Sequence, residues 1–437
     1  MSRVRQILDM NAFDAATGGD GAVKRRLDNL GAASVLFYRE PIEMVAARGA
    51  WMEARDGTRY LDFYNNVPSV GHSHPEVVAA ISAQVARLNT NTRYLVEIVD
   101  DYLEALKAKL PVDLSNVVMT CSGSEANDLA IRVARAVSGR HGLIVTDTAY
   151  HGNTALVTEA SPSALRRSPL PDHVVTVPAP GEAAYGGEDI AGGLRAAVVA
   201  AMQTLEARGH GIAAFLADSI FSSDGIFADP AGFLQPAVKT VQAAGGLYIA
   251  DEVQPGFGRT GDAFWGYERH GLAPDIVTMG KPMGNGFPMA GMAARPEHLA
   301  MFCEDVGYFN TFGGNPVAAA AGRAVLRVIA AEGLQENARR VGAHLKAGLA
   351  QIAAGSDRVT AVRGAGLFLG VDLGAQDGSG APDADYTVQV IDRMRDARVL
   401  IGAAGQFGAT LKVRPPLCLS MAEAERFLEA FAGAVSD

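Results

Sequence analysis

The sequence predicts an α/β protein with a large domain built on a covered, mostly parallel sheet and a smaller α+β domain. From residue 117 to residue 294, short apolar runs alternate with amphipathic helical segments, which is typical of a parallel sheet with helices on its faces. Beyond residue 315, two long helical segments precede a strand-rich end. A chain of 437 residues is long enough for both units. We therefore expect a large domain over residues 66–317, and a small domain formed by residues 1–65 together with residues 318–437.

The N-terminal part begins with a hairpin signal. Asp56-Gly57, a dipeptide that favours tight turns, separates two runs of strand-forming residues at 49–53 and 58–62. Helical periodicity then predicts helices over Pro75–Leu88 and Val99–Leu110.

The same periodicities give the remaining elements. The strands expected for the large sheet are Asn116–Thr120, Gly142–Thr146, Val174–Val177, Ala213–Asp218, 247–250, 275–279 and Met289–Ala293, with helices at 123–138, 190–207 and 233–244. The elements expected for the C-terminal part are helices over Ala318–Glu332 and Asn337–Ile352, and strands over Val359–Arg363, Gly366–Leu373, Val399–Gly402 and Leu411–Val413.

Composition excludes several classes of protein. Apolar residues make up 49% and charged residues 20%, as in ordinary globular proteins. A formal net charge of −10 argues against nucleic acid as a partner. The three cysteines lack metal-site or disulfide spacing, which indicates a reducing compartment. No secretory signal or bilayer-length apolar run is visible, so we expect a cytoplasmic protein without a membrane partner.

Two charged residues follow neighbouring apolar runs. Asp251 ends the run at 247–250, and Lys281 follows the run at 275–279. Ligands of open α/β sheets bind at the carboxyl ends of strands. A lysine in an apolar pocket becomes a nucleophile toward aldehydes, and a carboxylate can hold a pyridine nitrogen protonated. The pair therefore suits pyridoxal 5'-phosphate, and a buried Asp–Lys ion pair beside a loop is the alternative.

A second signal is the Gly-Ser turn at a strand-to-helix junction. Gly123 and Ser124 lie where free backbone N–H groups and the positive end of a helix dipole can hold a phosphate. Ser122 and Glu125 also form a capping-box pattern, and the two interpretations are compatible. Tyr150, at the end of the next expected strand, is either a residue that stacks on a flat ring or a core tyrosine.

Seven motifs in order resemble the class III aminotransferases, a group of fold type I pyridoxal phosphate enzymes. The motifs are CSGSEAN, AYHG, IADEVQPGFGRTG, VTMGKPMGNGFP, YFNTFGGNP, VRGAGLFLGV and LKVRPPL. The resemblance runs from about Phe37 to Leu428. It implies an aspartate aminotransferase-like fold with a mostly parallel seven-stranded sheet in the large domain.

The resemblance also implies a role for each cofactor-binding residue. Lys281 would be linked to the cofactor aldehyde and later shuttle a proton, while Asp251 would keep the ring nitrogen protonated. Gln254 would bind the ring hydroxyl, and Tyr150 would stack on the ring. Thr311 would reach the phosphate in the neighbouring subunit, which implies a homodimer. The full set is Gly123, Ser124, Tyr150, His151, Asp251, Val253, Gln254, Lys281 and Thr311.

The substrate side departs from the family pattern. Asp218 and Lys412 stand where many members pair a Glu with a carboxylate-binding Arg, and Asn153 replaces a second such Arg. Lysine lacks the bidentate fork of arginine, so this carboxylate clamp is weakened. Lys412, Arg414 and Arg93 are possible anion anchors, and for Arg93 a solvated helix-cap charge is the alternative. The substrate-binding residues that we expect are Asn66, Arg93, Asp218 and Lys412.

Three functions remain open. The leading one is a transaminase that moves an amino group between a primary amine or amino acid and a 2-oxo acid. Asn65-Asn66-Val67, LNTNTRYL and the LKxxPP ending are instead similar to ammonia-forming phospho-lyases, which act on O-phosphorylated amines such as phosphoethanolamine. A non-catalytic binding module of the same fold is the third. A dinucleotide dehydrogenase is disfavoured, since no GxGxxG motif follows a strand.

Overall fold

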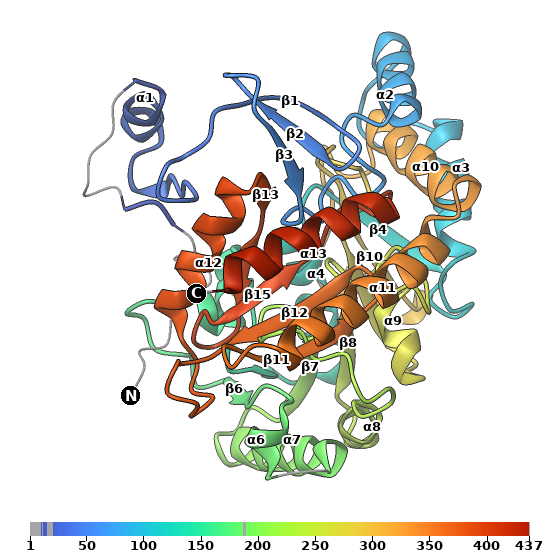
Figure 1. Ribbon diagram of the computed structural model, residues 1–437. Coiled ribbons are helices and arrows are strands. Elements are labelled where there is room, and N and C mark those ends of the chain that lie inside the picture. The colour runs from blue at the N-terminus through green and yellow to red at the C-terminus, as the bar shows by residue number, and fades with distance from the viewer. Residues whose placement is uncertain (1–9, 11, 15–20, 187–188, 437) are drawn as a thin grey trace.

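The computed structural model describes residues 10, 12–14, 21–186 and 189–436. Its centre is a seven-stranded sheet (Figure 1). The strand order across this sheet is β4 (Asn116–Thr120), β10 (Ala290–Ala294), β9 (Ile276–Met279), β8 (Leu247–Asp251), β7 (Ile212–Asp218), β5 (Gly142–Thr146) and β6 (Val174–Val177). Only β10 runs antiparallel to its neighbours, so the predicted α/β class with a mostly parallel seven-stranded sheet is confirmed.

Both faces of this sheet are covered, and side-chain alternation decides which face each residue serves. Leu143 and Val145 of β5 pack with the apolar face of α4 (Gly123–Ser138), whereas Ile144 between them packs with α7 (Ile190–Ala207) and α8 (Gln235–Ala243) on the other side. The sheet is therefore buried on both faces, which explains why its strands read as unbroken apolar runs. The shorter helices of this part are α5 (Ala155–Glu159), α6 (Glu182–Tyr185) and α9 (Pro296–Asp305).

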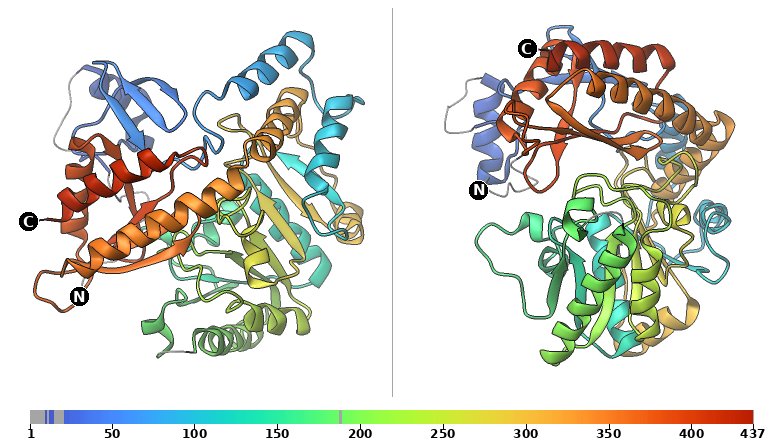
Figure 2. Two further views of the ribbon diagram at one scale, coloured as in Figure 1. Left: turned by 45° about the vertical axis from the view of Figure 1, so that its right-hand side comes forward. Right: turned by 60° about the horizontal axis from the view of Figure 1, so that its bottom comes forward.

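The N-terminal and C-terminal segments share a second sheet, whose strands are β1 (Met44–Arg48), β2 (Trp51–Ala54), β3 (Arg59–Asp62) and β13 (Val399–Leu400). The third sheet is formed by β11 (Val359–Ala365), β12 (Phe368–Leu373), β15 (Thr410–Val413) and β14 (Gly402–Ala404). Figure 2 shows these blue and red segments packed together on one side of the large sheet. The domain bounds stated above stay a prediction.

Seven further α-helices lie in the part of the chain that the structure describes. They are α1 (Gly21–Leu30), α2 (Pro75–Arg87), α3 (Glu97–Lys107), α10 (Pro316–Ala331), α11 (Leu334–Ala354) and α12 (Ala384–Asp396), with α13 (Met421–Val435) at the end. α10 packs against both α2 and α3. None of the described helices is long and apolar enough to cross a bilayer.

Two sequence-based expectations need correction. The single strand expected over Val399–Gly402 is two short strands in different sheets. β13 pairs with β3, the buried Ile401 follows it, and β14 then pairs with β15. In addition, α13 is not among the expected helices, although Ser420 and Glu423 form a complete capping box at its start. The box was readable from the spacing of these two residues.

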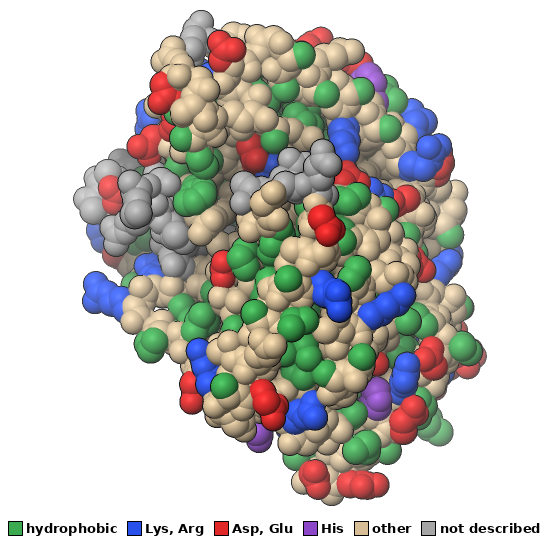
Figure 3. Space-filling view, turned by 90° about the horizontal axis from the view of Figure 1, so that it is seen from below, with side chains coloured by type: hydrophobic (Ala, Val, Ile, Leu, Met, Phe, Trp, Pro, Cys, Tyr) green, Lys and Arg blue, Asp and Glu red, His purple; other side chains and the backbone are tan. Residues whose placement is uncertain are grey.

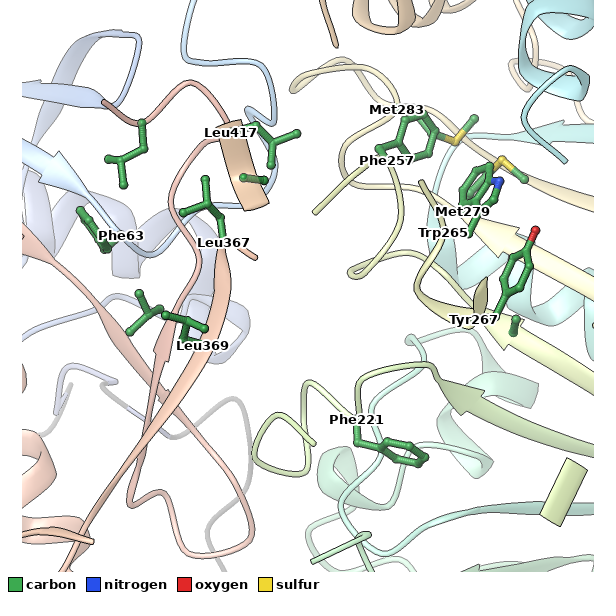
Figure 4. Close-up of a cluster of buried hydrophobic side chains, with 14 of the residues drawn as sticks. Phe63, Phe221, Phe257, Trp265, Tyr267, Met279, Met283, Leu367, Leu369 and Leu417 are labelled. Carbon is green, nitrogen blue, oxygen red and sulfur yellow. The ribbon is translucent and has the colours of Figure 1, made fainter. Parts of the chain in front are cut away.

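One apolar core joins the two parts. Figure 4 shows Phe63, Leu367 and Leu417 on one side, and Phe257 and Trp265 on the other, all members of a single buried cluster. A buried guanidinium crosses this boundary as well: Arg259 donates to the carbonyl oxygens of Leu367, at 3.2 Å, and Pro415. The face shown in Figure 3, by contrast, carries interspersed acidic and basic side chains.

Candidate active site

Asp251 closes β8 and is 5% exposed. Its Oδ2 accepts hydrogen bonds from His151 Nδ1 at 2.7 Å and from Asn127 Nδ2 at 3.0 Å, and its Oδ1 accepts one from the Val253 backbone at 3.1 Å. Burial by itself would raise the pKa of Asp251, but these hydrogen bonds hold that pKa below its usual value. The site therefore contains a buried carboxylate that stays ionised.

Asn127 is the residue at this site that sequence reasoning missed. It lies on α4, one turn beyond Gly123, and the same amide nitrogen also donates to the His151 carbonyl at 2.8 Å. Its Oδ1 accepts from the Thr278 hydroxyl at 2.6 Å, which fixes the orientation of the amide. The position in the CSGSEAN motif, four residues after Gly123 on the inward face of a helix, was the available signal.

Lys281 follows β9, the strand next to β8, and its side chain is half-buried. Burial and the positive charge of Arg414 lower the pKa of Lys281, and the carboxylates of Asp251 and Asp218 do not fully restore it. The direct Asp–Lys ion pair considered above does not form, because Asp251 is paired with His151 instead. An amine of lowered pKa and an ionised carboxylate therefore face the same end of the sheet.

The start of α4 forms a cradle of backbone groups. Ser122 and Glu125 make the complete capping box that the sequence predicts. A side chain on Gly123 would come within 2.9 Å of Val253, and one on Gly152 within 2.5 Å of the Ser124 hydroxyl. These positions are kept open by the missing Cβ atoms, which leaves room for an anion at the helix N-terminus.

Gln254 joins the cofactor side to the substrate side. Its Oε1 accepts from Arg414 Nη1 at 2.7 Å and from Asn66 Nδ2 at 3.3 Å, and its Nε2 donates to Ser222 Oγ at 2.6 Å. Tyr150 is half-buried at the loop after β5, and burial raises the pKa of its hydroxyl. All of these residues lie at the carboxyl ends of the parallel strands or on the segments that face them.

The expected substrate clamp is absent in its usual form. Asp218 ends β7 directly beside Asp251 in register, and its oxygens accept from the backbone of Ile220 and from Ser222. Lys412 on β15 is 3% exposed, and the negative charge of Asp218 acts to raise its pKa. Burial and the charge of Arg414 lower the pKa of Lys412 well below its ordinary value.

Arg93 and Thr311 are not part of this buried group. Both side chains are exposed, and the Arg93 guanidinium carbon lies 4.2 Å from the ring centroid of Phe309. Phe312, next to Thr311, is 70% exposed. Within one chain, therefore, neither side chain contacts the buried group around Asp251 in the described structure. The predicted role of Thr311 involves a second subunit.

A separate cavity of about 820 Å³ lies between the large sheet and the third sheet. Its walls include Thr148, Asp224, Phe227 and Arg363, but neither Lys281 nor Asp251. Asp224 is buried and accepts from Thr146 at 2.9 Å and Thr148 at 2.6 Å. Burial raises the pKa of Asp224 to about 6 in spite of these hydrogen bonds.

The residues present fit pyridoxal 5'-phosphate. The ionised Asp251 suits a protonated ring nitrogen, the cradle at α4 suits a phosphate, and Lys281 supplies an amine of lowered pKa. His151 Nε2 is buried without a hydrogen-bond partner in the described structure, so the pocket contains polar capacity that the protein alone leaves unused.

Comparison with known proteins identifies one family. The family described as Aminotransferase class-III matches residues 38–435. The chain is 40% identical over 424 residues to alanine--glyoxylate aminotransferase 2-like from Drosophila melanogaster. The matched region covers 94% of this chain and 85% of that protein. It is 39% identical over 419 residues to alanine--glyoxylate aminotransferase 2 homolog 2, mitochondrial, from Arabidopsis thaliana, with 94% and 86% covered.

A solved structure is similar over almost its whole length. This is a phospholyase from Arthrobacter in complex with phosphoethanolamine, which superposes with a TM-score of 0.91 at 41% sequence identity. The match covers 95% of this chain and 99% of the other.

Proposed function

The chain belongs to the class-III aminotransferase family, whose members use pyridoxal 5'-phosphate, and we propose that it moves an amino group between a primary amine or amino acid and a 2-oxo acid. The observation that carries this proposal is the arrangement of Asp251 and Lys281 on adjacent strands: a buried carboxylate kept ionised and an amine of lowered pKa. An amino-transfer site needs both groups.

The bound cofactor supplies an aldehyde that captures amines and a ring that withdraws electrons. Asp251 would keep the ring nitrogen protonated, and His151 and Asn127 keep that carboxylate ionised and oriented. Lys281 Nζ, an amine of lowered pKa, would move the proton at the substrate Cα. The lowered pKa of Lys281 supports this role, because a fully protonated lysine could not accept a proton.

The remaining residues would bind the cofactor and orient it. Gly123 and Ser124 at the start of α4 would bind the cofactor phosphate, Tyr150 would stack on the ring, and Val253 would also contact the cofactor. Gln254 would donate to or accept from the ring hydroxyl while it stays bonded to Ser222.

A homodimer is part of the proposal. Thr311 would complete the phosphate site of the neighbouring subunit, since its side chain is exposed within one chain. The apolar side chains around it support an interface: Phe309 is 44% exposed and Phe312 is 70% exposed. A cytoplasmic location also stays a prediction, because one of the named relatives is mitochondrial.

The amino-transfer proposal is tested with purified holoprotein, a panel of amine donors and pyruvate. We expect at least one donor to shift the cofactor absorption from the aldehyde form to the amine form, with alanine formed in equal amount. If no donor changes the cofactor spectrum or yields alanine, the proposal is wrong.

A second candidate, an ammonia-forming phospho-lyase, is favoured by one specific observation. The similar phospholyase structure contains phosphoethanolamine, and this chain replaces the carboxylate clamp of the family by Asp218, Lys412 and Asn153. In such a reaction the proton at Cα would be removed, a double bond would form between Cα and Cβ, and the C–O bond at Cβ would break so that phosphate leaves with that bond's electron pair. Water then releases ammonia and a carbonyl compound.

The two candidates are separated by leaving out the oxo acid. With phosphoethanolamine and related phosphorylated amines alone, a phospho-lyase releases ammonia and phosphate in equal amounts over many turnovers. A transaminase under the same conditions stops after one conversion of the cofactor and releases no phosphate.

A further inference from the structure

We propose that the cavity between the large sheet and the third sheet is a second ligand site, and that it binds an organic ammonium ion with an apolar body. The cavity measures about 820 Å³. It is separate from the active site, because its described walls include none of Lys281, Asp251, Gln254, Lys412 and Arg414. The inference therefore goes beyond the proposed function and does not depend on it.

The size and the walls of this cavity suit a small organic molecule. Ligand pockets commonly measure about 300–1,000 Å³, and this cavity falls within that range. The loop after β6 and the start of α7 contribute apolar side chains, among them Pro178 and Ile190. The third sheet and the loop before β15 contribute others, among them Leu373 and Phe407. The apolar part of a ligand can therefore be removed from water between two layers of the molecule.

The positive charge on these walls is already compensated. Arg363 donates to both carboxylate oxygens of Asp372, with 2.8 Å between Nη2 and Oδ1. Asp229 forms ion pairs with Arg269 and, at 3.1 Å, with Lys346. Arg363 is the one cationic side chain among the described wall residues, and its pairing with a carboxylate makes the cavity unsuitable for an anion.

Asp224 is the wall carboxylate that a ligand would bind. It is 6% exposed, and its side chain accepts from two uncharged hydroxyl groups, those of Thr146 at 2.9 Å and Thr148 at 2.6 Å. Each carboxylate oxygen has a second acceptor position, so Asp224 can accept further hydrogen bonds. A buried anion that is held by neutral donors is costly, and an ammonium ion beside it would reduce that cost.

A second carboxylate lies near Asp224. Asp147, in the loop after β5, also lines the cavity, and its side chain is exposed. Burial and the charges of Asp147 and Asp224 raise the pKa of Tyr185, so both carboxylates lie close to one phenol group. Two carboxylates at one end of the cavity attract a cation and repel an anion.

The chemistry of the walls defines the ligand. A protonated amine carries the N–H donors that Asp224 can accept, and its apolar part can fill the space beside Phe227 and Phe407. A charge-assisted hydrogen bond of this kind corresponds to roughly 10-fold or more in affinity. A neutral or anionic molecule of the same shape would lack it.

The test uses holoprotein whose cofactor has been fixed by borohydride reduction. The ligands are three molecules of similar size: the cation N,N-dimethylbenzylamine, the neutral 2-phenylethanol and the anion phenylacetate. A tertiary amine cannot condense with an aldehyde, so it measures binding alone. We expect isothermal titration calorimetry of wild type to give about 10-fold or more tighter binding of the amine than of the alcohol or the anion.

Asp224→Asn removes the charge and nearly keeps the shape of the side chain. It should weaken binding of the amine by about 10-fold or more and change that of the alcohol by less than about 2-fold. Asp275→Asn is the matched control, because Asp275 is 9% exposed and accepts from Gln242 Nε2 and the Tyr248 backbone, both at 2.9 Å, but does not line the cavity. It should bind the amine as wild type does.

Ala361→Phe tests the volume of the cavity without changing its charge, and it replaces Asp224→Asn if that variant does not fold. Ala361 of β11 lines the cavity, so a phenyl group there should weaken binding of the amine by about 10-fold or more. Ala47→Phe on β1 is its control, since Ala47 is also half-buried on a strand but does not line the cavity.

Hydrogen exchange locates the bound amine independently. Exchange in residues 405–410, which contribute to the walls, should slow in wild type with the amine and not in Asp224→Asn. If the amine binds no more tightly than the alcohol, or if Asp224→Asn and Ala361→Phe both bind it as wild type does, the second site is overturned. The reduced holoprotein performs no turnover, so these results stand whether or not the protein transfers amino groups.

Discussion

His151 donates from Nδ1 to Oδ2 of Asp251 over 2.7 Å, and both side chains are almost completely buried. The two residues are 100 positions apart in the sequence: His151 lies in the loop after β5, and Asp251 lies at the end of β8. This hydrogen bond fixes the tautomer of the imidazole and keeps the carboxylate ionised.

Replacing His151 by Phe should weaken cofactor binding about 10-fold or more, because a charge-assisted hydrogen bond to a buried carboxylate contributes about 1.5–3 kcal/mol. Spectroscopic titration of the apoprotein with pyridoxal phosphate measures this. His173→Phe is the control, since His173 also bonds a carboxylate, that of Glu159, at 3.1 Å, but away from the site. Equal affinities of both variants would contradict the role of His151.

Borohydride reduction of the holoprotein should fix the cofactor to Lys281. Lys412 is the competing amine, since it is also buried and its pKa is also lowered, by burial and by the charge of Arg414. Peptide mapping by mass spectrometry distinguishes the two. We expect the label on Lys281 in wild type and no label in Lys281→Ala, whereas a label on Lys412 in wild type would reverse the assignment.

Gly152→Ala should disturb the phosphate cradle. Gly152 has a φ of +144°, and a Cβ there would approach the Ser124 hydroxyl to 2.5 Å and the Ser124 Cα to 2.8 Å. Gly139→Ala at the end of α4, with φ +64° and no atom within 4 Å of the added Cβ, shares the backbone strain but not the contact.

Both glycine variants should therefore lose about 1 kcal/mol of stability from the positive φ. Only Gly152→Ala should also lose cofactor affinity, by 10-fold or more in the same spectroscopic titration. An unchanged affinity in Gly152→Ala would show that Ser124 does not contact the cofactor phosphate.

The free energy of unfolding should fall as the pH rises through 6, because Asp224 then loses its proton. Burial raises the pKa of Asp224 from 3.8 to about 6, so the folded state holds this proton more tightly than the unfolded state. The stabilisation is complete below about pH 4 and is lost as pH rises through 6; two pKa units correspond to about 3 kcal/mol.

Asp224→Asn removes this dependence and is the variant to measure. Denaturant unfolding at pH 4.5 and pH 7.5 should show wild type losing more stability than Asp224→Asn between these values. Asp147→Asn, an exposed carboxylate on the wall of the same cavity, should keep the wild-type profile. A parallel profile for wild type and Asp224→Asn would show that Asp224 is ionised throughout.

Phe312→Asp should convert a dimer into monomers. Phe312 is 70% exposed beside Thr311, and an aspartate in an apolar interface is strongly unfavourable. Sedimentation velocity measures the mass, and the activity of the loaded enzyme should fall with it. Leu170→Asp, at an exposed apolar residue in the loop before β6, should remain dimeric. A wild-type monomer would refute the interface.

Much of the fold could be predicted from the sequence because its strands are short apolar runs that stop abruptly. Asp251 follows four fully buried residues of β8, and its polarity marks the strand end that faces the site. The capping box of Ser122 and Glu125 likewise depends on residues three positions apart. Such signals depend only on residues that are close together in the sequence.

The contacts within the site could not be predicted in the same way. Asn127 and His151 meet on Asp251 from a helix and a loop more than 90 residues away, and Gln254 meets Arg414 across 160 positions. Arg93 is expected among the substrate residues, whereas within one chain it lies exposed against Phe309. Spacing along the chain does not define these distances.

The sequence by itself determined the α/β class, the family motifs and the two reactive groups, Asp251 and Lys281, because periodicity and strand ends depend on neighbouring residues. Only the tertiary structure decided the pairing of Asp251 with His151 instead of Lys281, and the burial of Arg414 with its Nε lacking a hydrogen-bond partner in the described structure. These outcomes depend on which side chains share a desolvated space, and packing of distant segments alone creates that space.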